Sequence, residues 1–412
     1  MIASRFFIVI IFLLSVAYSS AMIYDNRFLP EFKLPFSRTC EHQSRFYLAP
    51  TFMLAHKAYA DDIDDEVGIY DIFGTYNENN LRRAIIRIGG PDFFDTPALM
   101  NFKDKDVPWR MHGKIDAQGF IMCYDQHLWG HWSSGLSATF MHLFARNNFT
   151  LIPADVTLTV DDALALDEAR RAMDQYLLLK PPVWEKVGLG DIEWYIRFGS
   201  VWEYMFKLRR IDLGGRFGVL MPTGVKRNSL NPASIPFGGN GFWGIYVAGD
   251  FELEVREDWL VGGFLQLNQR FSRNETLRLP VADEQLLYGA LAGSLLVQPD
   301  PTLILSLYAK LEGVRDGLGF RAQYTGVFHG EDSFIDRRSD QKIPLTLTKM
   351  FDRSSWQSEY ITLDGFYDFN KIWQECSYMP VVNLMIDIPI KFFFAERVSK
   401  TNRVSLGIQF TY

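Results

Sequence analysis

The sequence predicts an all-β protein, a transmembrane antiparallel up-and-down β-barrel of about 14 strands with small helical insertions in its outer loops. Segments that alternate apolar and polar residues recur up to the last residue, and a period of two indicates strands. No helical segments remain to cover their apolar faces, whereas a bilayer would cover them. The chain also begins with a secretory signal, and a closed barrel lets a secreted chain cross a membrane without a spanning helix.

The stretch Asp191 to Leu208 shows the alternation most clearly. We expect its apolar, aromatic set to face lipid and its charged set to face the lumen. On this assignment, Ile196→Arg costs about 2–4 kcal/mol at mid-membrane and Arg197→Ile costs far less. The apolar set is Ile192, Trp194, Ile196, Phe198, Ser200, Trp202, Tyr204, Phe206 and Leu208. The other set is Asp191, Glu193, Tyr195, Arg197, Gly199, Val201, Glu203, Met205 and Lys207.

The composition of the 412 residues excludes some classes of protein. A formal net charge of -7 and the lack of a basic stripe argue against nucleic acid as a partner. Aromatic residues make up 15% of the chain, and such a content suits the aromatic girdles of a barrel at the two membrane interfaces.

The N-terminus predicts secretion. Arg5 precedes the apolar run from Phe6 to Val16, and small residues follow at Ser19 to Ala21, which is the pattern of a cleaved signal peptide. We therefore expect residues 1–21 to be removed and the mature chain to begin near Met22. Residues 22–44 are predicted to be an irregular lead or a plug, and residues 45–412 to be an outer-membrane barrel.

The predicted strands are even in number, as single-chain bacterial barrels require. Short connections at 129–131, 207–210, 256–258 and 298–301 alternate with longer ones at 60–113, 145–190, 222–240 and 272–284. Short turns are expected on the periplasmic side and long loops outside. The segments are 45–59, 114–128, 132–144, 191–208, 211–221, 242–255, 259–271, 285–297, 303–311, 318–328, 343–351, 355–369, 382–394 and 404–412.

Two of the connections carry more structure. The loop 60–113 should hold a helix over 78–88 capped by Asn77, and the loop 145–190 a helix over 161–179 capped by Asp161. The second helix is either loop packing or a gating lid, and a lid predicts that its deletion raises conductance. Residues 329–342 are predicted to form a long periplasmic turn.

The inward set of the predicted strands is charged, with the two signs nearly balanced. Opposite charges on neighbouring strands attract, so we expect a paired wall around a narrow, partly obstructed passage. The predicted lumen-lining residues are Asp191, Glu193, Arg197, Glu203, Asp212, Arg216, Asp250, Glu252, Glu254, Gln266, Arg270, Lys310, Arg321, Asp387 and Lys391.

Two features resemble a known family. The chain ends in a strand whose final residue is Tyr412, as bacterial outer-membrane barrels do. Gly188-Leu189-Gly190-Asp191 opens one strand and Leu220-Met221-Pro222-Thr223-Gly224 closes the next, which resembles the phenol-degradation meta-pathway family, relatives of the long-chain fatty acid transporter. The resemblance implies an outer-membrane transporter of small molecules, hydrophobic ones included, with membrane lipid, the barrel-assembly machinery and the cargo as partners and with no cofactor.

Two other functions stay open at this point. His131 and Ser133 resemble the His-x-Ser pattern of outer-membrane acyl hydrolases, in which the histidine activates the serine. Both, however, are predicted to face the lumen, away from a lipid substrate. The other alternative is a structural or adhesive barrel with a blocked lumen. No metal site is predicted, because the seven histidines are scattered.

The three cysteines give one further prediction. Barrel closure brings the first and last strands together, and the periplasm is oxidising. Cys40 precedes the first strand and Cys376 lies in a predicted periplasmic turn. These two are therefore predicted to form a disulfide, with Cys123 free, and unpaired cysteines remain the alternative.

Overall fold

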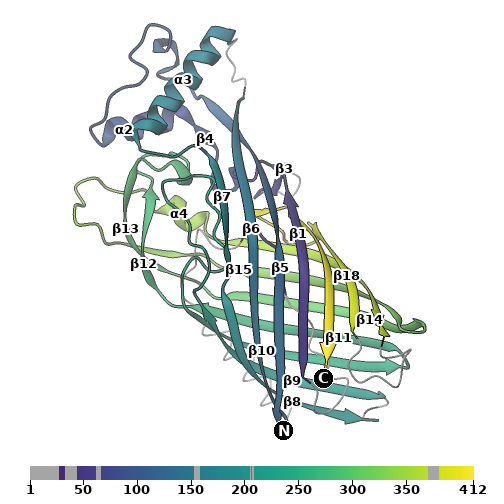
Figure 1. Cartoon of the computed structure of the whole chain (residues 1–412). Helices are drawn as coiled ribbons and strands as arrows, with labels where there is room; N and C mark the ends of the chain where they lie inside the picture. Colours follow the sequence, from purple (N-terminus) through teal and green to yellow (C-terminus); the bar gives the residue numbers. More distant parts are fainter. Residues whose placement is uncertain are drawn as a thin grey trace.

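The computed structural model describes residues 27–32, 44–61, 66–152, 158–204, 206, 208–369 and 380–412. Within these residues one antiparallel sheet holds 14 strands, and twelve of them close into a barrel (Figure 1). Each barrel strand pairs with the next along the chain, and the last pairs with the first, Thr411 opposite Arg45. The all-β, up-and-down prediction of about 14 strands is confirmed.

The twelve barrel strands fall into two groups by length. Two exceed the barrel wall and continue into the loops above it, β5 (Pro108–Trp129) and β6 (Trp132–Leu151). The other ten have 10 to 14 residues. They are β1 (Arg45–Ala55), β8 (Ile192–Glu203), β9 (Arg210–Met221), β10 (Gly244–Arg256), β11 (Trp259–Arg270), β14 (Thr302–Arg315), β15 (Leu318–His329), β17 (Trp356–Asp368), β18 (Val381–Ile390) and β20 (Asn402–Thr411).

The predicted alternation of faces is seen in the exposure of the side chains. On β8, Trp194 and Phe198 point outward and are 39% and 50% exposed, whereas Tyr195 and Arg197 point inward and are buried. Aromatic side chains stand at both ends of this outer surface, with Trp202 and Trp259 at the end of the short turns and Trp243 at the other. The barrel is therefore apolar outside and polar inside, the reverse of a soluble protein.

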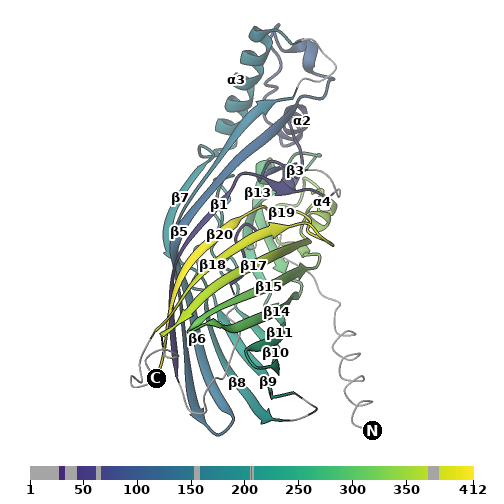
Figure 2. The same ribbon diagram turned by 90° about the vertical axis from the view of Figure 1, so that its right-hand side faces the viewer.

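The connections at the two ends differ in length. Four short turns join β5–β6, β8–β9, β10–β11 and β14–β15 at one end, here called the turn end, near which the C-terminus lies (Figure 2). Longer connections occupy the opposite loop end. We call these connections, with the loop-end parts of β5 and β6, the cap.

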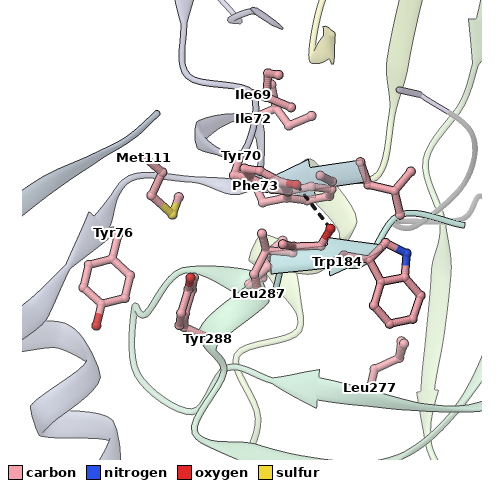
Figure 3. Close-up of a cluster of buried hydrophobic side chains, with 14 of the residues drawn as sticks. Ile69, Tyr70, Ile72, Phe73, Tyr76, Met111, Trp184, Leu277, Leu287 and Tyr288 are labelled. Carbon is pink, nitrogen blue, oxygen red and sulfur yellow. Dashed lines mark hydrogen bonds between the residues drawn. The ribbon is translucent and has the colours of Figure 1, made fainter. Parts of the chain in front are cut away.

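The cap has a conventional apolar core. Side chains from distant loops meet there, among them Tyr70, Phe73, Tyr76, Trp184 and Tyr288, all buried (Figure 3). Its helical segments are η1 (Asp71–Phe73), α2 (Glu78–Arg87), η2 (Met100–Phe102), α3 (Val160–Tyr176), η3 (Leu286–Tyr288) and α4 (Thr348–Asp352). Its strands are β2 (Ala58–Tyr59), β3 (Glu66–Val67), β4 (Tyr76–Asn77), β7 (Val183–Leu189), β12 (Arg273–Leu279), β13 (Leu291–Gln298), β16 (Ser333–Asp336) and β19 (Val398–Ser399).

Both helices expected in the long loops are present. Asn77 caps α2 by accepting a hydrogen bond from the Asn79 N–H at 3.0 Å. The predicted N-cap residue of α3, Asp161, was wrong. Thr159 is the N-cap residue and forms a capping box with Asp162, so the helix begins at Val160. α3 packs on the side of the cap remote from the barrel (Figure 1).

Two predicted barrel strands are corrected. Residues 285–297 do not cross the barrel, because β13 pairs with β12 and β16 in a separate three-stranded sheet whose Leu295 and Val297 are buried in the cap. Residues 343–351 form no strand and end in α4. Residues 298–301 are consequently not a short barrel turn, and residues 329–342 lie at the loop end. A half-buried sheet gives the same period of two as a barrel wall.

Candidate functional site

The N-terminal segment 27–32, here called the lumen segment, is held through its own main-chain carbonyls, which accept hydrogen bonds from side chains of β19, β20 and the residues between them. The Phe28 carbonyl accepts hydrogen bonds from Ser399 Oγ at 2.8 Å and Thr401 Oγ1 at 2.6 Å. Arg403 donates to the Pro30 carbonyl at 3.1 Å. Because these bonds use main-chain atoms, they fix the path of the segment whatever its side chains.

The two ends of the lumen segment are anchored differently. At the cap, the buried Arg27 guanidinium donates to the Ser354 carbonyl at 2.6 Å, and the Phe28 ring lies 6.0 Å from that of Phe73. Farther inside, Phe32 stacks on Tyr47 at 5.9 Å and 19°, and the Arg403 guanidinium lies 5.1 Å from the Phe32 ring. The segment therefore connects the cap to the barrel interior.

Cavities border this segment. One of about 140 Å³ is lined by Leu29, Phe32 and the wall of β5, β6 and β8, and another of about 70 Å³ by Leu29, Glu31 and the wall of β11, β14 and β17. A third, of about 20 Å³, lies beside Phe32. Sites for drug-sized ligands usually exceed about 300 Å³. A molecule of that size therefore needs the segment to move.

The strongest charge cluster lies on β8, β9 and β10. Arg197 is 1% exposed and donates to Asp212 at 2.9 Å and to Asp250 at 2.6 Å. Arg216 also donates to Asp250, at 2.9 Å. The nearby Glu252 accepts from Arg210 at 2.9 Å. Each buried charge here has an opposite partner on a neighbouring strand, which removes most of the cost of burying it.

A second cluster explains the Gly-Leu-Gly-Asp motif. The Asp191 carboxylate accepts from Arg270 at 2.8 Å, from the Gly239 N–H at 2.8 Å and from the Gly224 N–H at 3.3 Å. A Cβ on Gly224 would lie 2.0 Å from the Phe237 carbonyl oxygen. The motif thus joins two loops at the loop end of the lumen, where Asp191 and Arg270 line the 140 Å³ cavity together with Glu193.

A third cluster contains residues that the sequence prediction missed. Asp387 accepts from Arg403 at 2.5 Å, and Arg321 pairs with Asp364 at 2.8 Å. The predicted last strand began at residue 404. A strand that began at Arg403 would have placed this arginine on the inward face together with Ser405. Arg45 also pairs with Asp125, and here the weak alternation of β1 gave no signal.

The other predicted lining residues are spread out. Gln266 is buried and donates to Asn268 at 2.6 Å. Glu203 is exposed at the turn end, where Glu254 lies 3.8 Å from Arg209 and Lys310 pairs with Glu312. Lys391 lies at the loop end, 5.7 Å from the Tyr59 ring. The cavities around the lumen segment are therefore not lined by Glu203, Glu254, Lys310 or Lys391.

The residues of the hydrolase alternative are not brought together. His131 is exposed in the β5–β6 turn, where its ring lies edge-on to the outward-facing Phe198 at 5.7 Å. Ser133 points inward and is buried. The prediction that both face the lumen is therefore wrong for His131, since a turn residue does not follow the alternation of the strand.

The cap holds a buried acidic cluster beside α3. Glu78 is fully buried and accepts from Trp109 Nε1 at 2.9 Å, and Asp174 accepts from Arg170 at 3.1 Å. Burial raises the pKa of Glu78 to about 8 and that of Asp174 to about 7, because desolvation penalises the charged form. Both carboxyl groups therefore keep a proton to higher pH in the folded cap than in the unfolded chain.

The described residues offer neither a metal site nor a membrane-spanning helix. No group of three or more histidine, cysteine, aspartate or glutamate side chains is arranged to hold a metal ion within the described part of the chain. None of the helices formed by the described residues is long and apolar enough to span a membrane. The predicted Cys40–Cys376 disulfide lies outside the described residues, and Cys123 is half-buried on β5.

The chain was compared with known proteins. No protein-family model matches it, and neither does any curated protein. Among solved structures, the COG4313 outer membrane channel from Pseudomonas putida F1 is similar at 12% identity and a TM-score of 0.46, covering 94% of this chain and 98% of that chain.

Two further structures are less similar. The TodX deltaS2S3 mutant monoaromatic hydrocarbon channel is 9% identical with a TM-score of 0.36, covering 90% of this chain and 91% of that chain. A Pseudomonas aeruginosa FadL homologue is 7% identical with a TM-score of 0.31, covering 90% of each chain. All three TM-scores are below 0.5, so the function proposed below rests on this chain's own residues.

Proposed function

We propose that this chain is a bacterial outer-membrane channel for small molecules, in which the lumen segment must move for cargo to pass. The inverted polarity of the closed barrel carries the proposal. Leu265, Leu307 and Phe320 on the outer wall are each about half exposed, while Arg197 and Asp250 on the inner wall are buried. Such a surface is stable only in a hydrocarbon layer, and a polar wall suits a water-accessible interior.

Cargo with an apolar surface fits the larger cavity best. Its lining includes Leu29, Phe32, Ile121, Met141 and Leu220 alongside the charged groups. The motif resemblance described for residues 188–191 and 220–224 also favours hydrophobic cargo. An apolar body next to a few polar groups is typical of small-molecule sites, so we expect small, uncharged, partly apolar molecules as cargo.

A planar-bilayer recording of the purified full chain tests the proposal. We expect infrequent, small conductance steps in the native protein and more frequent steps in Arg403→Gln, since that change weakens the donor to Pro30 and Glu31. Arg171→Gln is the matched control, because Arg171 lies exposed in the cap. A native protein with large, steady conductance equal to that of Arg403→Gln would contradict a gated passage.

The structural or adhesive barrel is the second candidate function. The small cavities and the anchored lumen segment favour it. It predicts no conductance in the native protein or in any variant of the segment. The hydrolase alternative is tested by esterase activity, which Ser133→Ala must abolish.

A further inference from the structure

The connection from β18 to β19 leaves the sheet and returns to it. Ile390 pairs with Glu359, and Glu396 pairs with Gln357 through two backbone hydrogen bonds of 3.0 and 2.8 Å. Five residues therefore stand opposite the single residue Ser358. The extra residues have no partners on β17 and must project from the sheet. We call residues 392–395 of this projection the wedge.

The wedge lies on the outer face of the barrel. Tyr324 and Phe328 alternate with the inward-facing Thr325 and Val327 on β15, so they point outward. The Phe394 ring lies 4.1 Å from that of Phe328, and the Phe393 ring lies edge-on to Tyr324 at 6.3 Å. Gly326 makes room for it, because a Cβ there would lie 2.8 Å from the Phe394 ring.

A carboxylate on the outer face holds the wedge in shape. Glu359 is 1% exposed, and its oxygens accept from the N–H groups of Phe392, Phe393 and Phe394, each at 3.0 Å, and of Ala395 at 3.1 Å. The Tyr324 hydroxyl donates to the same carboxylate at 2.6 Å. Hydrogen bonds to an ionised acceptor are among the strongest in proteins, and these five shield the charge from its apolar surroundings.

Two of the three phenylalanine rings of the wedge are mostly exposed. Phe392 is 73% and Phe393 is 72% exposed, although the backbone beneath them is fixed by Glu359. They follow the loop-end terminus of β18, whose Ile388 belongs to the apolar outer wall and is 39% exposed. A rigidly held pair of exposed phenylalanines continuous with an apolar wall requires an apolar partner.

We propose that the wedge is a membrane anchor whose partner is the acyl chains at the outer edge of the lipid layer. The inference rests on the proposed membrane location of the barrel. Continuity with the apolar wall favours lipid over a second copy of the chain, because the surface around Phe392 and Phe393 already faces hydrocarbon. Transmembrane barrels also carry girdles of aromatic residues at both membrane interfaces.

Photo-crosslinking of the full chain in phosphatidylcholine vesicles tests the anchor. The photoreactive residue p-benzoylphenylalanine replaces Phe393, and lipid adducts are found by mass spectrometry. Phe320, which is half exposed on the outer wall toward the turn end, is the positive control. Val160, which is 78% exposed in the cap, is the matched control for exposure without membrane contact.

The expected result is a lipid adduct at positions 393 and 320 and none at 160. An adduct at 320 without one at 393, or a protein dimer formed from position 393, would overturn the anchor and leave the membrane location intact. Absence of lipid adducts at both 393 and 320 would overturn the membrane location as well.

A second variant tests the role of Glu359. Glu359→Gln replaces an acceptor-only carboxylate by an amide whose NH₂ cannot accept from the wedge. Chymotrypsin, which cuts after aromatic residues, is then expected to cleave the wedge faster in vesicles, while Glu396→Gln behaves like the native protein. Equal cleavage of native protein and Glu359→Gln would show that the carboxylate does not hold the wedge.

Discussion

The barrel and the cap place similar residues in opposite surroundings. In the barrel, Leu265 and Leu307 are about half exposed and Arg197 is 1% exposed, whereas in the cap Leu166 is fully buried and Arg171 is exposed. The same chain therefore follows two solvation rules, and the boundary runs along β5 and β6, which belong to both regions. Solvent, rather than secondary structure, decides which face of a strand carries the apolar residues.

The largest expected effect is the loss of stability when a buried arginine of the barrel is replaced. Arg197→Met leaves Asp212 and Asp250 without their shared buried partner, which typically costs about 3–5 kcal/mol. This revises the sequence-based expectation that Arg197→Ile costs far less than Ile196→Arg. Urea unfolding in vesicles measures it, with the exposed Arg256→Met as control. Equal stability of both variants would mean that the ion cluster is not formed.

The cap should respond to the loss of apolar volume as a soluble domain does. Leu166→Ala on α3 removes a fully buried side chain, at a typical cost of about 2–5 kcal/mol. We expect proteolysis of the cap to accelerate while the heat-modifiable gel mobility of the barrel is unchanged. Loss of that mobility would show that the two regions unfold together.

A charge on the outer wall should cost more than the same charge on the cap. Leu265→Arg lies at mid-barrel and is expected to cost about 2–4 kcal/mol. Leu164→Arg on α3, where the leucine is 59% exposed, should change stability by less than about 0.5 kcal/mol. Refolding into vesicles compares the two, and equal damage would contradict the assignment of the outer wall to lipid.

The smallest expected effect is a pH dependence confined to the cap. Burial raises the pKa of Glu78 to about 8 from its ordinary value of 4.5, so the folded cap keeps a proton that the unfolded chain has lost. Cap stability should therefore fall as pH rises through this window, by about 2 kcal/mol between pH 6 and pH 8.

Glu78→Gln removes this titration while keeping an acceptor for Trp109 Nε1. The urea midpoint for protease cleavage of the cap, measured at pH 6 and pH 8, should then be flatter in the variant than in the native protein. A native midpoint that rises with pH would mean that Glu78 is ionised when folded.

Much of the barrel could be predicted from the sequence, because one face of each strand meets a uniform solvent. Twelve strands and the outward position of Trp194 and Phe198 follow from the period of two. The same period misplaced residues 285–297, whose alternation serves a small sheet inside the cap. Local pattern does not say which solvent a face meets when loops fold on one another.

The lumen was predicted less well than its wall. Charge parity led to Arg197, Asp212 and Asp250, whose pairing depends on neighbouring strands. The lumen segment has no alternation, and several of the hydrogen bonds that fix its path are made by the main-chain carbonyls of Phe28 and Pro30. Nothing in its composition specifies those contacts, so only its length and position suggested a plug.

Removal of the lumen segment tests most directly whether the polar interior is closed by the chain itself. The measurement is single-channel conductance of the protein lacking residues 22–32, with residues 1–21 kept for secretion, compared with the native protein in the same bilayer. We predict long-lived openings of larger conductance in the truncated protein, with unchanged heat-modifiable mobility. A correctly folded truncated protein with native conductance would contradict the account.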